Sequence, residues 1–208
     1  MVSMNRRSQN HSLLIRGGHL IDPAARIDVP MDVLLRDGQV AEVVPPGKTR
    51  GSAHDKFDAR GLIVAPGFID LHVHLREPGQ SYKESIATGT AAAAAGGFTS
   101  VCCMPNTHPV VDSTEWVTWL QQPARGAVVN VFPIAAATKV SKGAALTDFR
   151  ALQRAGAVAV TDDGRPILGE DIMREALRLA AEINLPVIQH AEDTRITEHC
   201  SMNDGPTA

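Results

Sequence analysis

Aromatic side chains are scarce in this chain: Phe, Trp and Tyr together make up 4% of its 208 residues. Base-stacking platforms for nucleic acids and aromatic cages for cations need such side chains, so the composition argues against both. Neither sign of charge dominates, because 20 basic residues stand against 23 acidic ones and the formal net charge is −3. This balance provides no general attraction to nucleic acid or to an anionic membrane surface. We therefore expect no nucleic acid and no membrane among the partners.

Cysteine is also rare, and the three cysteines are Cys102, Cys103 and Cys200. A small, odd number without regular spacing is not a disulfide framework and indicates a reducing compartment. If Cys102 and Cys103 lie on a strand, their side chains point to opposite faces. The start of the chain lacks the apolar stretch of a signal peptide. The uncharged segment 85–111 is rich in Ala, Gly and Thr and is too weakly apolar for a membrane span, so we expect a cytoplasmic protein.

Several enzyme motifs are missing from the sequence. It contains no Gly-Lys-Ser/Thr phosphate loop, no GxGxxG, no GxSxG nucleophile elbow and no CxxC pair. Any catalytic residues must therefore belong to other motifs.

The pattern of the sequence changes near residue 66. Residues 1–12 are expected to form a flexible tail, and the short apolar runs of 13–65 predict a small β unit. Within it, Asp37-Gly38 between two apolar runs is typical of a hairpin. Across residues 66–208, strand-like runs alternate with helix-like segments at intervals of about 30 residues, the length of a β-α-β step. This alternation predicts an α/β domain with a parallel sheet.

Five strands and four helices are expected in this second part. The strands are Phe68–Val73, Thr99–Met104, Val128–Ile134, Val158–Val160 and Pro186–Gln189, and the helices are Tyr82–Ala95, Thr114–Gln122, Leu146–Ala155 and Glu170–Ile183. A capping-box pattern, Ser81 and Glu84, precedes the first helix, and a related pattern with Asp112 in the cap position and Glu115 precedes the second. Five such units are fewer than the eight of a closed (β/α)₈ barrel, so a barrel would be incomplete here.

The strongest local signal is the pair His72 and His74 at the end of the first of these strands. Residues two apart on a strand face the same side, so the two imidazoles could bind one divalent metal ion. The alternative is two polar residues on an exposed strand face. Carboxyl ends of strands are where α/β enzymes place their sites, which favours the metal.

Two further signals of the same kind follow later strands. Asp162-Asp163-Gly164 comes after the fourth strand and would be read in isolation as a turn. His190 comes after the fifth strand and is ambiguous alone. Because all these side chains fall at carboxyl ends of strands, together they predict the ligand cluster of a zinc hydrolase.

Arg76 and Asn106 are candidates for substrate binding. Arg76 lies two residues beyond the histidine pair, and Asn106 follows the second strand. A guanidinium can bind a carboxylate through two hydrogen bonds, and an amide adds a neutral donor. Alternatively, Arg76 could pair with Glu77 or Asp70, and Asn106 could simply belong to a turn.

Four segments, in this order, are PGFIDLHVHLREPG, MPNT, VTDDG and the His of VIQHAED. Together they resemble the bacterial type I dihydroorotases of the amidohydrolase superfamily, over the chain from about Leu13 onward. The resemblance implies a TIM-barrel metallo-hydrolase with a small N-terminal β-sandwich unit. It also implies the reversible cyclisation of N-carbamoyl-L-aspartate to (S)-dihydroorotate in pyrimidine biosynthesis. Related hydantoinases and allantoinases usually have a carboxylated lysine where this chain has TDDG.

The resemblance also implies roles for individual residues. His72 and His74 would bind the first of two zinc ions, Asp163 would bridge both, and His190 would bind the second. Arg76 and Asn106 would hold the carboxylate of the substrate. The family pattern includes a further His ligand and a late catalytic Asp, and both fall beyond position 208. We therefore expect an N-terminal portion of a dihydroorotase that is a poor catalyst alone.

Two other functions remain open. One is a hydantoinase- or allantoinase-type amidohydrolase, and the other is an inactive homologue that serves as a scaffold for aspartate transcarbamoylase. The intact metal-ligand residues argue against an inactive homologue. We expect a small-molecule substrate as a binding partner. The assemblies to test are a homodimer and an association with aspartate transcarbamoylase.

Overall fold

A computed structural model describes residues 11–197 and 205–206 of the chain. It divides the chain into two compact units, with the boundary between Gly67 and Phe68. The predicted tail falls mainly on residues 1–10, which lie outside the described residues, and Ser12 already belongs to the first strand. Cys200 also lies outside the described residues.

The first unit is one mixed β-sheet. Its strands are β1 (Ser12–Asp22), β2 (Ile27–Arg36), β3 (Gln39–Val44), β4 (Asp55–Asp58) and β5 (Ile63–Val64). They follow the order β3-β2-β1-β4, and β5 also pairs with β1. The predicted hairpin is confirmed, because Arg36 pairs with Gln39 across Asp37 and Gly38. These two loop residues have φ values of 52° and 76°, as a type I′ turn requires.

A buried carboxylate holds two turns of this sheet together. Asp32 is 2% exposed, and its two carboxylate oxygens accept hydrogen bonds of 2.8 Å from the backbone N–H groups of Gly17 and Gly47. Backbone donors compensate the cost of burying the charge. The role of Asp32 is therefore structural.

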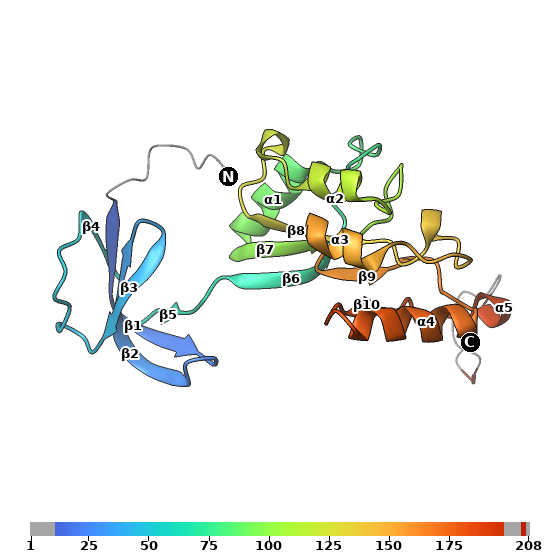
Figure 1. Ribbon diagram of the computed structural model, residues 1–208. Helices are drawn as coiled ribbons and strands as arrows, with labels where there is room; N and C mark the ends of the chain where they lie inside the picture. Colours follow the sequence, from blue (N-terminus) through green and yellow to red (C-terminus); the bar gives the residue numbers. More distant parts are fainter. Residues whose placement is uncertain (1–10, 198–204, 207–208) are drawn as a thin grey trace. The chain divides into compact units, whose positions relative to one another are not determined.

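The second unit is built on a parallel five-stranded sheet (Figure 1). Its strands are β6 (Phe68–Val73), β7 (Phe98–Cys103), β8 (Asn130–Ala135), β9 (Ala159–Thr161) and β10 (Val187–Ile188). All neighbours are parallel and follow the chain order without reversal. In a barrel, each strand lies next to the one that precedes it in the chain, always on the same side. In a doubly wound sheet, the strand order reverses at one point. The five strands thus form an open half-barrel, which confirms the predicted fold class.

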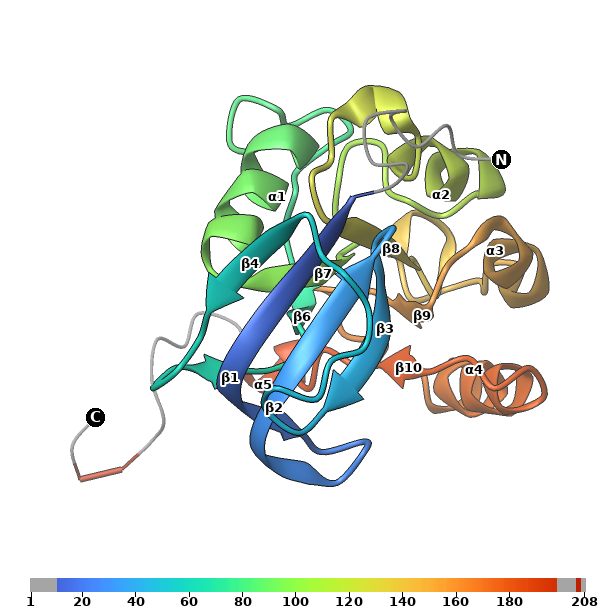
Figure 2. The same ribbon diagram turned by 90° about the vertical axis from the view of Figure 1, so that its left-hand side faces the viewer.

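Four helices, α1 (Ile86–Ala95), α2 (Thr114–Leu120), α3 (Phe149–Ala155) and α4 (Glu170–Ala181), lie around the outside of these strands (Figure 2). The short helix α5 (Thr194–Thr197) follows β10, and there are 3₁₀ turns at η1 (Pro123–Arg125) and η2 (Lys139–Ser141). Among the described residues, no helix has both the length and the apolar character needed to cross a membrane.

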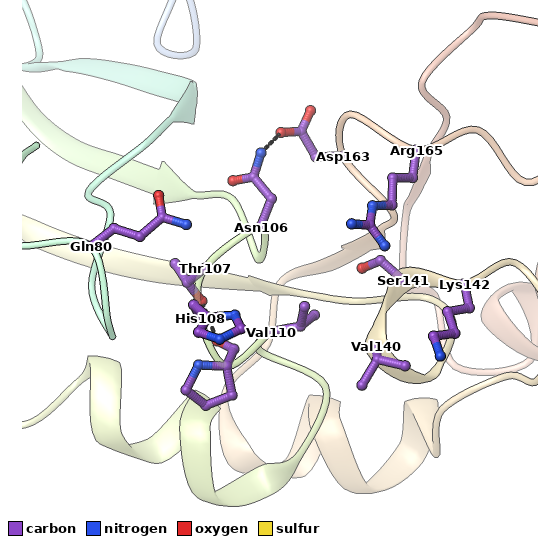
Figure 3. A pocket seen from close by; sticks show the side chains of 11 residues that line it. Gln80, Asn106, Thr107, His108, Val110, Val140, Ser141, Lys142, Asp163 and Arg165 are labelled. Atoms are coloured by element: carbon purple, nitrogen blue, oxygen red, sulfur yellow. Dashed lines mark hydrogen bonds between the residues drawn. The ribbon is translucent and has the colours of Figure 1, made fainter. Parts of the chain in front are cut away.

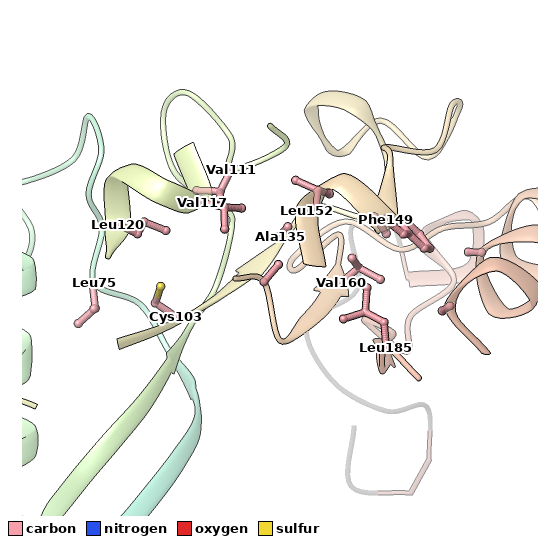
Figure 4. Packing of buried hydrophobic residues seen from close by; sticks show 14 of the residues in the cluster. Leu75, Cys103, Val111, Val117, Leu120, Ala135, Phe149, Leu152, Val160 and Leu185 are labelled. Carbon is pink, nitrogen blue, oxygen red and sulfur yellow. The ribbon is translucent and has the colours of Figure 1, made fainter. Parts of the chain in front are cut away.

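The main core fills the space between the sheet and the helices (Figure 4). Cys103 belongs to this core, whereas its neighbour Cys102 packs in a separate cluster with Met104 and Ile134. The prediction that the two cysteines face opposite sides of the strand is therefore confirmed. Neither forms a disulfide, and burial raises the pKa of the Cys103 thiol to about 12.

Both predicted helix caps were wrong. Helix α1 begins at Ile86, and its capping box joins Ser85 to Thr88 instead of Ser81 to Glu84. The carboxylate of Glu84 accepts hydrogen bonds from Ser85 and Thr88 and so supports the real cap from outside.

At α2 the N-cap residue is Ser113, one position later than predicted. The carboxylate of Asp112 instead accepts a hydrogen bond of 2.9 Å from the backbone N–H of Val140, in the loop after β8. At α2, a contact distant in sequence thus replaces the local cap that the sequence predicted.

Candidate metal centre

Strand β6 delivers His72 and His74 to the same side of the sheet. Their imidazole centroids are 5.1 Å apart, with an angle of 70° between the ring planes. Val73, between them, packs against the main core and anchors the strand. Consecutive side chains of a strand point to opposite faces. Because Val73 packs against the core, His72 and His74 lie on the opposite face of the strand. The His72 side chain is 51% exposed and that of His74 is 29% exposed.

The two aspartates after β9 separate into different roles. Asp162 is 1% exposed, and its carboxylate accepts hydrogen bonds from the backbone N–H and the hydroxyl of Thr138. It therefore fixes the loop after β8 and is not available to a ligand. Asp163 points to the other side, toward the histidine pair, and its side chain is 11% exposed.

These three side chains form a compact donor set. One ligand atom each from His72, His74 and Asp163 lies within 4.8 Å of the other two. The Nε2 atoms of His72 and His74 are 3.4 Å and 3.7 Å from the two carboxylate oxygens of Asp163. Two ligands at about 2.1 Å from a tetrahedral zinc ion are themselves about 3.4 Å apart, so the set fits a metal ion. The group could therefore hold a divalent metal.

Asn106 connects two members of the set. Its Nδ2 donates to Asp163 Oδ2 at 2.6 Å (Figure 3), and its Oδ1 lies 3.0 Å from His74 Nδ1. A carboxylate only accepts, so the amide nitrogen must face Asp163 and the amide oxygen must face His74. His74 Nδ1 is then the protonated nitrogen, which leaves a lone pair on Nε2. A metal ion needs that tautomer.

This link was not part of the sequence prediction. Asn106 was expected to hold substrate or to belong to a turn. It is separated from Asp163 by 57 in sequence number, and no sequence pattern indicated that the two side chains are in contact. The tetrapeptide MPNT directly after β7 was the available hint, because it places an amide at the carboxyl end of the next strand.

His190 lies outside the three-residue group. Its Nε2 is 2.9 Å from the carboxylate of Glu192, and this contact, after the one from Thr197, lowers the pKa of Glu192. Strand β10, which precedes it, is two residues long and pairs with β9 alone among the described strands.

Arg76 adopts neither of the pairings that the sequence left open. Glu77 accepts a hydrogen bond from the backbone N–H of Ile86, and Asp70 accepts one from that of His72. Within residues 11–197, Arg76 forms no ion pair and is half-buried. Its backbone has φ of 61°, a left-handed conformation that is uncommon outside glycine.

Comparison with known proteins identifies relatives of the chain. A family model described as dihydro-orotase-like matches residues 61–208. The chain is 49% identical over 194 residues to a dihydroorotase of Solibacter usitatus, which covers 93% of the chain and 45% of the relative. It is 50% identical over 195 residues to a dihydroorotase of Citrifermentans bemidjiense, covering 93% and 46%. The chain thus spans about half the length of these curated relatives.

Solved structures show the same fold at low sequence identity. L-hydantoinase (dihydropyrimidinase) from Arthrobacter aurescens matches with a TM-score of 0.74 at 20% identity, over 89% of this chain and 42% of that one. A D-hydantoinase matches with a TM-score of 0.69 at 23% identity, over 90% and 42%. N-acyl-D-glutamate deacylase from Bordetella bronchiseptica, solved with zinc, matches with a TM-score of 0.59 at 21% identity, over 86% and 44%. The half-barrel and the separate sheet match the N-terminal portion of the hydantoinase fold.

Proposed function

Because this chain belongs to the dihydro-orotase-like family, we propose that it supplies metal-binding and substrate-binding residues of a zinc-dependent cyclic amidohydrolase. The proposed reaction is the reversible cyclisation of N-carbamoyl-L-aspartate to (S)-dihydroorotate, a step of pyrimidine biosynthesis. The observation that carries the proposal is the convergence of His72, His74 and Asp163 within 4.8 Å at the open end of the half-barrel.

Three of the proposed metal ligands belong to this donor set. His72 and His74 would hold a first zinc ion and His190 a second, with Asp163 as a ligand of both. Two imidazoles and a carboxylate are donors that zinc accepts, and the Asn106 contact leaves His74 Nε2 free to coordinate. Bound zinc supplies Lewis-acid polarisation of an amide carbonyl and lowers the pKa of a nearby water.

His190 has to exchange its contact with Glu192 for a metal to fill this role. The two side chains are 38% and 36% exposed, so water can replace each partner and breaking their contact costs little free energy.

Substrate orientation is assigned to Arg76 and Asn106. The guanidinium of Arg76 has no carboxylate partner among the described residues, which leaves it available to bind the carboxylate of a substrate. Asn106 sits beside the proposed ligands, so a substrate held there would lie close to the polarising metal. These two residues bind and orient the substrate, and no proton transfer is assigned to them.

Activity is best tested together with metal content. We expect the purified 208-residue chain to bind zinc and to cyclise carbamoyl aspartate slowly, because it spans about half the length of the dihydroorotases it matches. His72→Ala should remove zinc binding. His19→Ala is a matched control, because His19 lies in the first unit and contacts Asp28 at the surface.

The alternatives give different results in the same assays. Turnover of hydantoin or allantoin instead of dihydroorotate would indicate another cyclic amidohydrolase. Binding to aspartate transcarbamoylase that survives His72→Ala, without zinc and without turnover, would indicate the inactive scaffold. The identity near 50% to dihydroorotases favours the first proposal over both.

A further inference from the structure

Glu77 lies directly after Arg76, in the loop between β6 and α1, and its side chain contacts the first residue of α1. We propose that Glu77 is a positioning residue, whose carboxylate fixes the backbone of Arg76 in the conformation that presents the guanidinium to the carboxylate of a substrate. The inference rests on the proposed function. It adds to that function a residue that neither binds a metal nor touches the substrate.

The backbone of Arg76 needs support from its surroundings. Its φ of 61° lies in the left-handed region, which is unfavourable for a residue with a Cβ. Residues in this region persist only where the surrounding structure fixes them, and they are frequent at ligand sites. Without such support, Arg76 would relax toward a more common backbone conformation and the direction of its side chain would change.

Both neighbours of Arg76 are attached to helix α1. Leu75 is 4% exposed and belongs to the main core. It packs so closely on Gly89 that a Cβ at this glycine would lie 2.6 Å from Leu75 Cδ2. On the other side, Glu77 Oε2 accepts a hydrogen bond of 2.9 Å from the backbone N–H of Ile86. Arg76 is thus held between two contacts with the same helix.

The contact of Glu77 is not needed to complete the local cap of α1. The side chain of Ser85 accepts a hydrogen bond from Thr88 N–H, and the side chain of Thr88 accepts one from Ser85 N–H. Ile86 N–H is a further donor of the first turn, which this capping box leaves for another partner. The main effect of the Glu77 contact is therefore to attach the loop to the helix.

The loop that Glu77 attaches also borders the metal and substrate site. Gln80, in this loop, lines a pocket of about 440 Å³ together with Asn106 and Asp163 (Figure 3). The backbone N–H of Gln80 donates a hydrogen bond of 3.0 Å to the carbonyl of Arg76. A change at Glu77 would therefore alter both the backbone of Arg76 and the border of this pocket.

Two conservative variants separate the length of the Glu77 side chain from its charge. Glu77→Gln keeps an oxygen at the same distance from the backbone, and this oxygen can still accept from Ile86 N–H. Glu77→Asp keeps the charge, but its shorter side chain reaches Ile86 only if the loop moves. If the contact positions Arg76, Glu77→Gln should behave as the unmodified chain does, and Glu77→Asp should behave as Glu77→Ala does.

The first measurement needs neither metal nor substrate. Hydrogen–deuterium exchange of the metal-free chain reports how firmly residues 76–83 are held. We expect Glu77→Ala to accelerate exchange about tenfold in this segment and Glu77→Gln to restore slow exchange. Exchange in β7 should stay unchanged and verifies that the variants are folded. Unchanged exchange of residues 76–83 in Glu77→Ala would overturn the inference.

The second measurement is dihydroorotate binding by the zinc-loaded chain, followed by titration calorimetry. We expect Arg76→Ala to remove measurable binding. Glu77→Ala should weaken binding about tenfold, the loss of one hydrogen bond to a charged group, and Glu77→Gln should stay within about twofold of the unmodified chain. Glu115→Ala is the matched control, because Glu115 is an exposed acidic residue in the first turn of α2.

Zinc affinity distinguishes positioning from a general loss of structure. It should be the same in all these variants, because none of them changes a proposed metal ligand. A purely structural role of Glu77 would lower zinc affinity together with dihydroorotate affinity, and this result would overturn the inference. Equal dihydroorotate binding by Glu77→Ala and the unmodified chain would also overturn it.

Failure of the proposed function would give a different pattern. The unmodified zinc-loaded chain would then not bind dihydroorotate, whereas Glu77→Ala would still accelerate exchange around Arg76 and Glu77→Gln would restore it. That pattern would contradict the proposed substrate and support the attachment of the Arg76 backbone by Glu77.

Discussion

The amide of Asn106 joins His74 to Asp163, with hydrogen-bonding distances of 3.0 Å to the imidazole Nδ1 and 2.6 Å to the carboxylate. His74 follows β6, Asn106 follows β7 and Asp163 follows β9. The amide therefore bridges side chains from separate strands by hydrogen bonds. It also sets the tautomer that His74 needs to coordinate a metal ion.

Asn106→Ala should weaken zinc binding although no proposed ligand is removed. Loss of an outer contact to a metal-binding histidine typically costs about 10–100-fold in affinity, and we expect a loss in that range. Zinc affinity can be measured by competition with a chromogenic chelator. Asn130→Ala is the control, because Asn130 contacts the carbonyl of Thr99 at the beginning of β8. Unchanged affinity of the Asn106 variant would remove the amide from the metal site.

Asp162 and Asp163 should respond in opposite ways to the same substitution. Asp162→Asn places an amide N–H beside the donors of Thr138, so we expect the free energy of unfolding to fall by about 2–3 kcal/mol. Asp163→Asn should change stability little and abolish tight zinc binding. Chemical denaturation and zinc titration of both variants test the contrast, and a reversed pattern would show that Asp162 is the ligand.

Gly79 should tolerate no side chain. It has φ of 82°, and a Cβ there would lie 1.7 Å from the backbone oxygen of His108. Gly38 has a similar φ of 76° but open space around it. We expect Gly38→Ala to cost about 1–2 kcal/mol for the left-handed backbone. Gly79→Ala should cost clearly more, because the main chain that borders the pocket must move. Equal melting temperatures for the two variants would contradict the described loop.

The Cys103 thiol should resist alkylation until strongly alkaline pH. Burial disfavours the thiolate and raises its pKa to about 12, whereas an unfolded cysteine ionises near pH 8.5. Iodoacetamide labelling at pH 8, followed by peptide mass spectrometry, should modify Cys103 only after denaturation. The unfolded chain also binds fewer protons than the folded one between these pKa values. The contribution of this thiol to the free energy of unfolding therefore falls as pH rises from about 9 toward 12.

The sequence predicted the elements whose cause is local. Strand β6 was predicted with its observed bounds from the run of strand-forming residues that follows Gly67. The regular alternation of strands and helices predicted the parallel sheet. The spacing of His72 and His74 predicted that they share a face.

Long-range contacts account for what the sequence did not reveal. Asp112 resembles a helix cap in sequence, yet it holds Val140 because tertiary packing brings the loop after β8 to it. Ser141 and Arg165 lie in loops without periodicity, so only the fold shows that they border one pocket. The contact of Asn106 with Asp163 has the same origin.

The most direct measurement of the central claim is zinc K-edge X-ray absorption on the zinc-loaded chain. We expect imidazole nitrogens and carboxylate oxygen at about 2.0–2.2 Å in the unmodified chain, and no zinc retained at this site in His72→Ala. A spectrum with sulfur at about 2.3 Å, or one that His72→Ala leaves unchanged, would show that zinc binds elsewhere and contradict the proposed site.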